Sequence, residues 1–208
     1  MKLSKELKIE ELKKIKRLLI NIDMVNGFVK EGALAAPSIK KIIPHNIELI
    51  EEFINDDDSA VFFIRDAHTD NAVEFKVFGK HCLKGTKESE LVDELKDYEE
   101  YGHTYFKNST NFVFAPNFID DIRKMTNLEE VVLNGCLTDY CVKNGGISLR
   151  NLFDQDDRDI RIIVDEAGVD TYDAPSHNRD IASFHALADM ADNGIIRVKK
   201  YGGKKWKN

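Results

Sequence analysis

The sequence has no long apolar stretch. None of its apolar runs approaches the roughly 20 residues that a membrane-spanning helix needs. The first 17 residues mix both signs of charge and lack the apolar segment of about 7–15 residues that a secretory signal contains. We therefore expect a cytoplasmic protein with no membrane partner.

Cysteine is also scarce. The 208 residues include three cysteines, an odd number that offers no complete set of disulfide pairs. This composition fits a reducing compartment, in which a thiol is either a small buried side chain or a reactive group. We therefore expect the cysteines to serve packing or chemistry rather than cross-linking.

An excess of positive charge is lacking between the two ends of the chain. The first 17 residues carry seven Lys or Arg and the last ten carry five Lys, yet the net charge is −7 because the middle is acidic. Nucleic-acid binding needs a positive face that displaces counterions from phosphates. We expect no nucleic-acid partner for the body of the protein.

Two nucleotide-binding motifs are missing as well. The chain contains neither G-x-G-x-x-G nor G-x-x-x-x-G-K-[ST]. Their absence argues against a dinucleotide-dependent dehydrogenase and against a P-loop nucleoside triphosphatase.

What the sequence does contain is an alternation of short runs rich in valine and isoleucine with segments of helical periodicity. This alternation predicts a single α/β domain, with a mainly parallel sheet of about five to six strands between two layers of helices. The expected strands are residues 18–23, 60–65, 130–135, 160–164 and 195–198. The expected helices are residues 38–54, 89–98, 117–125, 138–153 and 175–190, with 3–16 as an amphipathic helix.

The expected domain organisation is simple. Residues 1–17 form an amphipathic N-terminal leader, residues 18–200 form the domain, and residues 201–208 form a basic C-terminal tail. Within the domain, residues 66–111 show no clear periodicity. Irregular segments of this length in a compact domain are typical of functional loops.

Reactive or acidic residues follow the first four expected strands. Because ligands gather at the carboxyl ends of strands in a parallel α/β sheet, these residues are expected to converge on one rim. They are Asp23, Asp66 with His68, the segment Thr138-Asp139-Tyr140-Cys141, and Asp165.

Cys136 and Cys141 lie in different settings. Cys136 continues the apolar run V-V-L-N-G-C and is interpreted as a small buried hydrophobic residue. Cys141 follows Thr138 and Asp139, two good N-cap residues, and so is expected in the first turn of a helix. There the free N–H groups and the helix dipole would lower the thiol pKa and could hold an oxyanion.

A nucleophilic thiol benefits from a base and from a positive group that favours the ionised pair. Asp23, at the end of a neighbouring strand, can supply the base. Lys107, which follows a short aromatic run in the irregular segment, can supply the positive charge. The plain alternative for Lys107 is a solvated surface side chain.

A second cluster has the chemistry of a metal site. The segment from Arg65 to Thr86 supplies carboxylate and imidazole donors, which suit Zn, Mn or Fe without choosing among them. Adjacent residues of an extended chain point to opposite sides, which argues against Cys82 as a further ligand beside His81. The candidate metal ligands are Asp66, His68, Glu74 and His81.

Taken together, five motifs resemble the isochorismatase-like cysteine hydrolases, and within that superfamily the nicotinamidases. The resemblance runs from about Leu18 to Val198, nearly the whole chain. The motifs are D-M-V-N-G-F at 23–28, D-A-H at 66–68, F-G-K-H-C-L-K-G-T at 78–86, Lys107, and C-L-T-D-Y-C-V at 136–142.

This resemblance implies the fold and the reaction. It implies a three-layer α/β/α sandwich and a catalytic triad of Asp23, Lys107 and Cys141, with Cys141 as the nucleophile. It implies a non-proline cis peptide between Cys136 and Leu137, and an oxyanion hole formed by the backbone N–H groups of Leu137 and Cys141. The implied reaction is hydrolysis of nicotinamide to nicotinate and ammonia through a thioester.

The resemblance also assigns the substrate and metal residues. Phe28 and Phe78 match aromatic positions that flank the substrate ring. Asp66, His68 and His81 match metal ligands, and Glu74 stands where some members supply a fourth. One divalent ion is implied, with zinc expected first and manganese or iron as alternatives. The implied partner is a small substrate, nicotinamide or a related amide, and homo-oligomerisation is left open.

Two departures leave other readings open. In the first motif, Val25 stands where many members have Gln and Gly27 where many have Asp. The segment between His68 and His81 also differs from the proline-rich versions of the family. Metal-free relatives that hydrolyse isochorismate, carbamoylsarcosine or ureido compounds share the triad, so another substrate of this kind is one alternative. A catalytically silent domain that binds a metabolite is the other.

Overall fold

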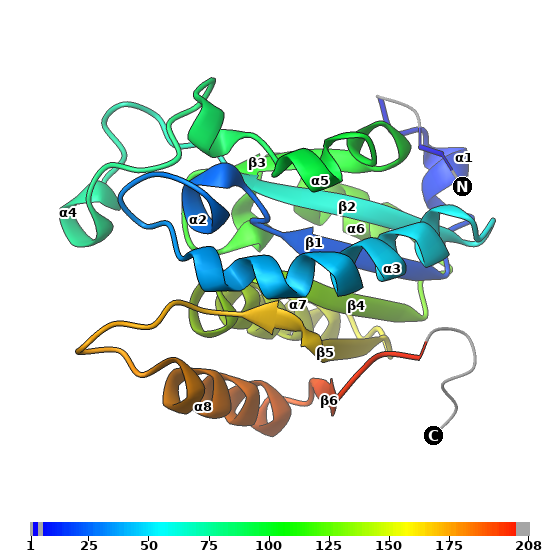
Figure 1. Cartoon of the computed structure of the whole chain (residues 1–208). Helices are drawn as coiled ribbons and strands as arrows, with labels where there is room; N and C mark the ends of the chain where they lie inside the picture. The colour runs from blue at the N-terminus through cyan, green and yellow to red at the C-terminus, as the bar shows by residue number, and fades with distance from the viewer. Residues whose placement is uncertain (1, 4–5, 203–208) are drawn as a thin grey trace.

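The computed structural model describes residues 2–3 and 6–202. Within them, six parallel strands form one sheet in the order β3-β2-β1-β4-β5-β6 (Figure 1). The strands are β1 (Arg17–Ile22), β2 (Ser59–Asp66), β3 (His103–Lys107), β4 (Glu130–Cys136), β5 (Arg161–Asp170) and β6 (Ile196–Val198). The predicted α/β class and parallel sheet are confirmed.

Helices cover both faces of this sheet. Figure 1 shows α3 in front of it, with α6 and α7 behind. The α-helices are α1 (Ile9–Leu12), α2 (Asn26–Val29), α3 (Ile43–Ile54), α4 (Phe75–Phe78), α5 (Asp93–Lys96), α6 (Phe118–Lys124), α7 (Lys143–Gln155) and α8 (Arg179–Asp192). The short 3₁₀ segments are η1 (Pro37–Ile42), η2 (Lys87–Ser89), η3 (Glu99–Tyr101) and η4 (Phe112–Phe114), and η5 (Thr138–Val142) is a π-helical turn.

The central strands are buried on both sides because successive side chains point to opposite faces. In β1, Leu18 and Ile20 join the core cluster that contains Phe118 of α6, whereas Leu19 joins the cluster that contains Phe53 of α3. The continuous aliphatic runs seen in the sequence are therefore strands packed between two helical layers. Among the described residues, no helix is long and apolar enough to cross a bilayer.

Several expected elements differ from those observed. The segment 66–111 is not irregular throughout, since it contains the edge strand β3. The helix expected at 89–98 is reduced to α5 between two 3₁₀ turns, and the helix expected at 3–16 is reduced to α1. Each is flanked by turns whose backbone bonds reach only three residues back, such as Tyr98 N to Leu95 O.

The two ends of the chain pack more closely than a leader and a tail would suggest. Leu12 and Ile15 are fully buried in the core, and Tyr201 is buried with its hydroxyl donating to Glu130. The rest of the expected tail, residues 203–208, lies outside the described residues. The expected division at residues 17 and 201 stays a prediction.

The strand order brings the ends of β1 and β4 together. From β1 to β3, successive strands are added toward one edge of the sheet, and from β4 to β6 they are added toward the other edge. Parallel α/β sheets bind ligands at the point where this order reverses, which here lies between β1 and β4. At this point Gly135 has φ of 105°, and a Cβ there would lie 2.0 Å from the carbonyl oxygen of Ile22. Only glycine allows β4 to pass so close to the end of β1.

Close packing also explains a glycine inside α7. A Cβ on Gly145 would lie 2.1 Å from two ring carbons of the fully buried Phe112. We expect Gly145→Ala to lower the free energy of unfolding by about 1–2 kcal/mol, because overpacking outweighs the better helix propensity of alanine. Urea unfolding measures this change. Asn151→Ala, at an exposed position of the same helix, is the control and should leave stability within about 0.5 kcal/mol; equal stability of the two variants would contradict the packing argument.

Candidate active site

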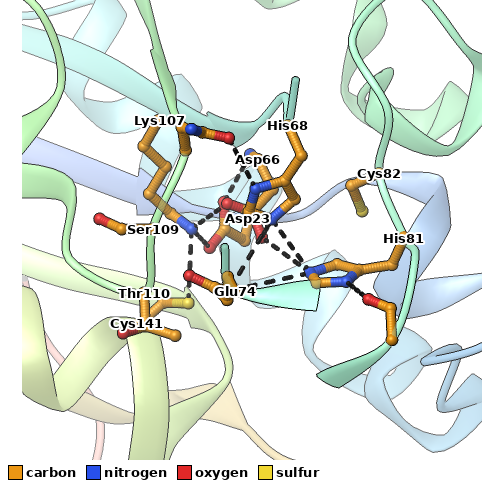
Figure 2. Close-up of polar contacts among 12 residues, drawn as sticks. Asp23, Asp66, His68, Glu74, His81, Cys82, Lys107, Ser109, Thr110 and Cys141 are labelled. Carbon is orange, nitrogen blue, oxygen red and sulfur yellow. Dashed lines mark hydrogen bonds and ion pairs between the residues drawn. The ribbon is translucent and has the colours of Figure 1, made fainter. Parts of the chain in front are cut away.

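Asp23, Lys107 and Cys141 meet at the carboxyl ends of β1, β3 and β4. The Lys107 ammonium lies 2.8 Å from Asp23 Oδ2 and 3.5 Å from Cys141 Sγ, and it also pairs closely with Asp66 Oδ1. Figure 2 shows the lysine pointing into the centre of this group. All of these side chains are buried, so the surface interpretation of Lys107 is wrong.

The backbone after β1 holds Asp23 in place. Asp23 has φ of 51°, a left-handed conformation that aspartate tolerates better than most residues. Its N–H donates to the carbonyl of Ile64, and its Oδ1 accepts the N–H of Asp66 at 2.9 Å. Burial raises the pKa of Asp23 to about 6, although the charge of Lys107 opposes the shift. The paired Lys107 ammonium favours the ionised carboxylate, and the raised pKa makes this carboxylate a better proton acceptor than an ordinary aspartate.

Two carboxylates surround the single ammonium. Burial opposes the charged form of Lys107, but Asp23 and Asp66 outweigh it and hold the pKa of the lysine well above its usual value. Burial likewise opposes ionisation of Asp66, but Lys107 and the neighbouring histidines hold its pKa well below the usual range. A buried charge of this kind persists only because it is paired.

The setting of Cys141 differs from the expectation in two respects. Leu137 takes the N-cap position, while the Thr138 hydroxyl has no partner within the described residues and Asp139 binds elsewhere. Burial raises the pKa of the Cys141 thiol well above its ordinary value, with Lys107 opposing, so the expected lowering of this pKa is wrong. Burial removes water from the sulfur and so disfavours the charged thiolate.

The expected metal ligands also come together. Asp66, His68, Glu74 and His81 offer donor atoms that all lie within 4.8 Å of one another. The Nε2 atoms of His68 and His81 are 3.1 Å apart, and Asp66 Oδ2 lies 3.3 Å and 3.6 Å from them. Cys82 is buried beside the cluster but is not among the residues that offer a donor.

The outer hydrogen bonds of the two histidines show that a cation suits this cluster. His81 Nδ1 lies 2.9 Å from the carbonyl oxygen of Gly79, and His68 Nδ1 lies 3.0 Å from Asn108 Oδ1, an oxygen that also accepts the N–H of Thr69. Both Nδ1 atoms must therefore carry a proton, and in the neutral imidazoles the two Nε2 lone pairs then face each other and two carboxylates. A divalent cation would satisfy all four donors.

A cavity of about 490 Å³ opens onto both groups. Phe28, Phe78 and Leu137, expected from the sequence, line it beside Cys141 and His81. The Cys136–Leu137 peptide is cis, as the resemblance implies. The cavity is of the size that takes small ligands.

Some residues of the site were not expected from the sequence. Asn108 follows Lys107 directly and orients His68, and that adjacency was the available signal. Thr110 and Tyr172 line the cavity, but they stand out neither by type nor by spacing.

One expected member of the rim lies elsewhere. β5 continues five residues beyond Asp165, so this carboxylate sits within the strand and pairs with His45 Nε2 at 2.6 Å and with the N–H of Tyr201. Cys136 is fully buried, with its Sγ 3.1 Å from the carbonyl oxygen of Asp23, in agreement with its interpretation as a core residue.

Comparison with known proteins places these features in a family. The isochorismatase domain model matches residues 17–193. Nicotinamidase 1 of Arabidopsis thaliana is 30% identical over 89% of this chain and 83% of its own length, and a probable inactive nicotinamidase of the same plant is 25% identical over 60% of this chain and 68% of its own. The crystal structure of Pyrococcus horikoshii pyrazinamidase in complex with zinc superposes with a TM-score of 0.72 at 23% identity, covering 88% of this chain and 98% of that one.

The sheet, the buried triad-like group and these matches define a hydrolase of the α/β class. The chain belongs to the isochorismatase family.

Proposed function

We propose that this protein is a metal-dependent cysteine amidase that hydrolyses nicotinamide to nicotinate and ammonia. The observation that carries the proposal is a shared cavity. Cys141, with Asp23 and Lys107 beside it, opens onto the same space as Asp66, Glu74 and His81 of the candidate metal cluster. The similarity to the plant nicotinamidase supports the choice of substrate.

The first half of the reaction forms a thioester. Asp23 accepts the proton of the Cys141 thiol as the sulfur attacks the carbonyl carbon of the amide, and Lys107 offsets the charge of the pair. The backbone N–H groups of Leu137 and Cys141 donate to the developing oxyanion. Asp23 then returns the proton to the departing nitrogen, and the C–N bond breaks to release ammonia.

The second half regenerates the enzyme. Asp23 accepts a proton from water as the water oxygen attacks the thioester carbonyl carbon. The C–S bond breaks, the acid is released, and the sulfur of Cys141 recovers its proton from Asp23. The raised pKa of Cys141 favours this return to the neutral thiol between turnovers.

Asp66, His68, Glu74 and His81 would hold one divalent ion, with zinc expected first and manganese or iron as alternatives. When bound, such an ion would act as a Lewis acid toward the pyridine nitrogen of the substrate. Phe28 and Phe78 would contact the faces of the ring. Correct placement of the ring can contribute several kcal/mol to catalysis.

Removing one imidazole tests the proposed ligand set. We expect His81→Ala to retain less than about a tenth of the metal bound by the unchanged protein after gel filtration, since three donors with one open side bind far more weakly. Elemental analysis measures metal per chain. His45→Ala, at a histidine paired with Asp165 away from the cluster, is the control and should keep about one ion per chain; full occupancy in His81→Ala would contradict the ligand set.

The two rivals are separated by substrate. A metal-independent member of the family would hydrolyse a ureido compound such as N-carbamoylsarcosine faster than nicotinamide and would keep its activity in the presence of a chelator. A silent member would hydrolyse neither, and one of the plant relatives is named as inactive. Measuring both substrates with one metal-loaded preparation tests the proposal, which requires higher kcat/KM for nicotinamide.

A further inference from the structure

An aromatic wall flanks Cys141 in the cavity. The rings of Tyr140 and Tyr172, which both line the cavity, lie 6.4 Å apart and within 25° of parallel. Phe78 meets Tyr140 edge to face at 5.5 Å. Aromatic faces and edges at these separations attract one another and would attract a further planar ring.

A histidine outside the cavity lining supports this wall. The ring of His177 stacks on that of Tyr172 at 3.8 Å and 12°, and lies 6.4 Å from that of Tyr140. His177 is itself held in a tight turn, because its N–H and carbonyl exchange hydrogen bonds with Ala174. The ring of Tyr172 is therefore supported on one side by the ring of His177.

Asp139 links His177 to the turn that carries Cys141. Its Oδ2 lies 2.7 Å from His177 Nε2, and its Oδ1 accepts the hydroxyl proton of the fully buried Thr171 at 2.6 Å. Asp139 lies two residues before Cys141 in η5. One carboxylate thus links the reactive turn to the loop that follows β5.

We propose that Asp139 and His177 are positioning residues that hold Tyr172 alongside Tyr140, and that the resulting wall selects amides carrying a planar aromatic ring. The reaction itself rests on the proposed function, but recognition of the ring does not. Hydrogen-bonded packing of this kind fixes side-chain rotamers, so its loss should weaken ring binding without removing any group that touches the amide.

The test is calorimetric binding of two amides to the metal-loaded Cys141→Ala protein, in which turnover is blocked. Benzamide has a planar ring without a pyridine nitrogen, and cyclohexanecarboxamide has a ring of the same size that is not planar. In the parent we expect tighter binding of benzamide. Adding His177→Ala should weaken benzamide binding about tenfold and change that of cyclohexanecarboxamide by less than about twofold.

Further variants separate positioning from folding. His177→Gln keeps a donor for Asp139 without an aromatic ring and should also weaken benzamide binding, whereas Tyr172→Phe keeps the ring of the wall and should preserve it. His185→Ala, at an exposed histidine of α8, is the matched control and should bind both amides as the parent does.

Benzamide affinity that is unchanged in both His177 variants, equal losses for the two amides, or a parent that does not prefer benzamide would overturn the inference. Nicotinamide turnover by the unchanged protein is measured separately. Absent turnover with intact selectivity for benzamide would reject the proposed reaction and leave the positioning role standing.

Discussion

Replacing Cys141 by alanine is expected to lower kcat for nicotinamide hydrolysis by at least about a thousandfold, because no thioester can form without the sulfur. The side chain is buried and lines the cavity, 3.5 Å from the Lys107 ammonium, and its loss leaves Lys107 paired with Asp23 and Asp66. The fold and the metal content should therefore be kept. Steady-state ammonia release measures the effect.

Cys82→Ala is the matched control for this substitution. Cys82 is equally buried and lies next to His81, but its sulfur faces the carbonyl oxygen of Glu88 at 3.8 Å and does not line the cavity. Its kcat should stay within about threefold of the unchanged protein. Turnover by folded, metal-loaded Cys141→Ala above a few per cent of normal would rule out the thioester route.

Replacing Asp23 by asparagine is expected to lower kcat about 100-fold to 10,000-fold, the range that a general base contributes. Asparagine has the same shape and can still accept the N–H of Asp66 through Oδ1, so the end of β1 should keep its conformation. It cannot accept the proton of Cys141 or pass it to the leaving nitrogen. Single-turnover kinetics would show the loss in formation of the acyl enzyme.

Asp165→Asn is the control for a buried carboxylate. Asp165 is also fully buried, but it pairs with His45 and lies within β5 rather than at its end. Its removal should affect stability more than turnover, with kcat within about threefold of normal. Similar kcat losses in the two variants would mean that loss of a buried charge, rather than loss of a base, explains the effect at Asp23.

The sequence was sufficient to predict that the residues at the ends of the central strands lie close together. Asp23, Asp66 and Cys141 come at or after aliphatic runs, and these runs are buried strands whose carboxyl ends meet at the reversal of strand order. The strand that ends at Lys107 was not predicted, because His103–Lys107 lacks an aliphatic run and pairs only with β2 at the edge of the sheet. Edge strands are short and weakly patterned.

Features that depend on tertiary contacts could not be predicted. Asp139 looked like a helix cap from its neighbours, but it binds His177, 38 residues away. From its place at a helix start, the thiol of Cys141 was expected to have a lowered pKa, whereas burial raises it. Burial is a property of the packed molecule rather than of the local sequence. The resemblance predicted which residues gather at the site, and the structure shows what surrounds each of them.

The most direct test of the proposed reaction is ammonia release from nicotinamide by three preparations: the unchanged protein loaded with metal, the same protein after removal of metal by a chelator, and metal-loaded Cys141→Ala. The proposed reaction predicts turnover in the first and loss of at least about a hundredfold in the other two, with recovery when metal is restored to the second. Absence of turnover in the first preparation, or undiminished turnover in either of the others, would contradict it.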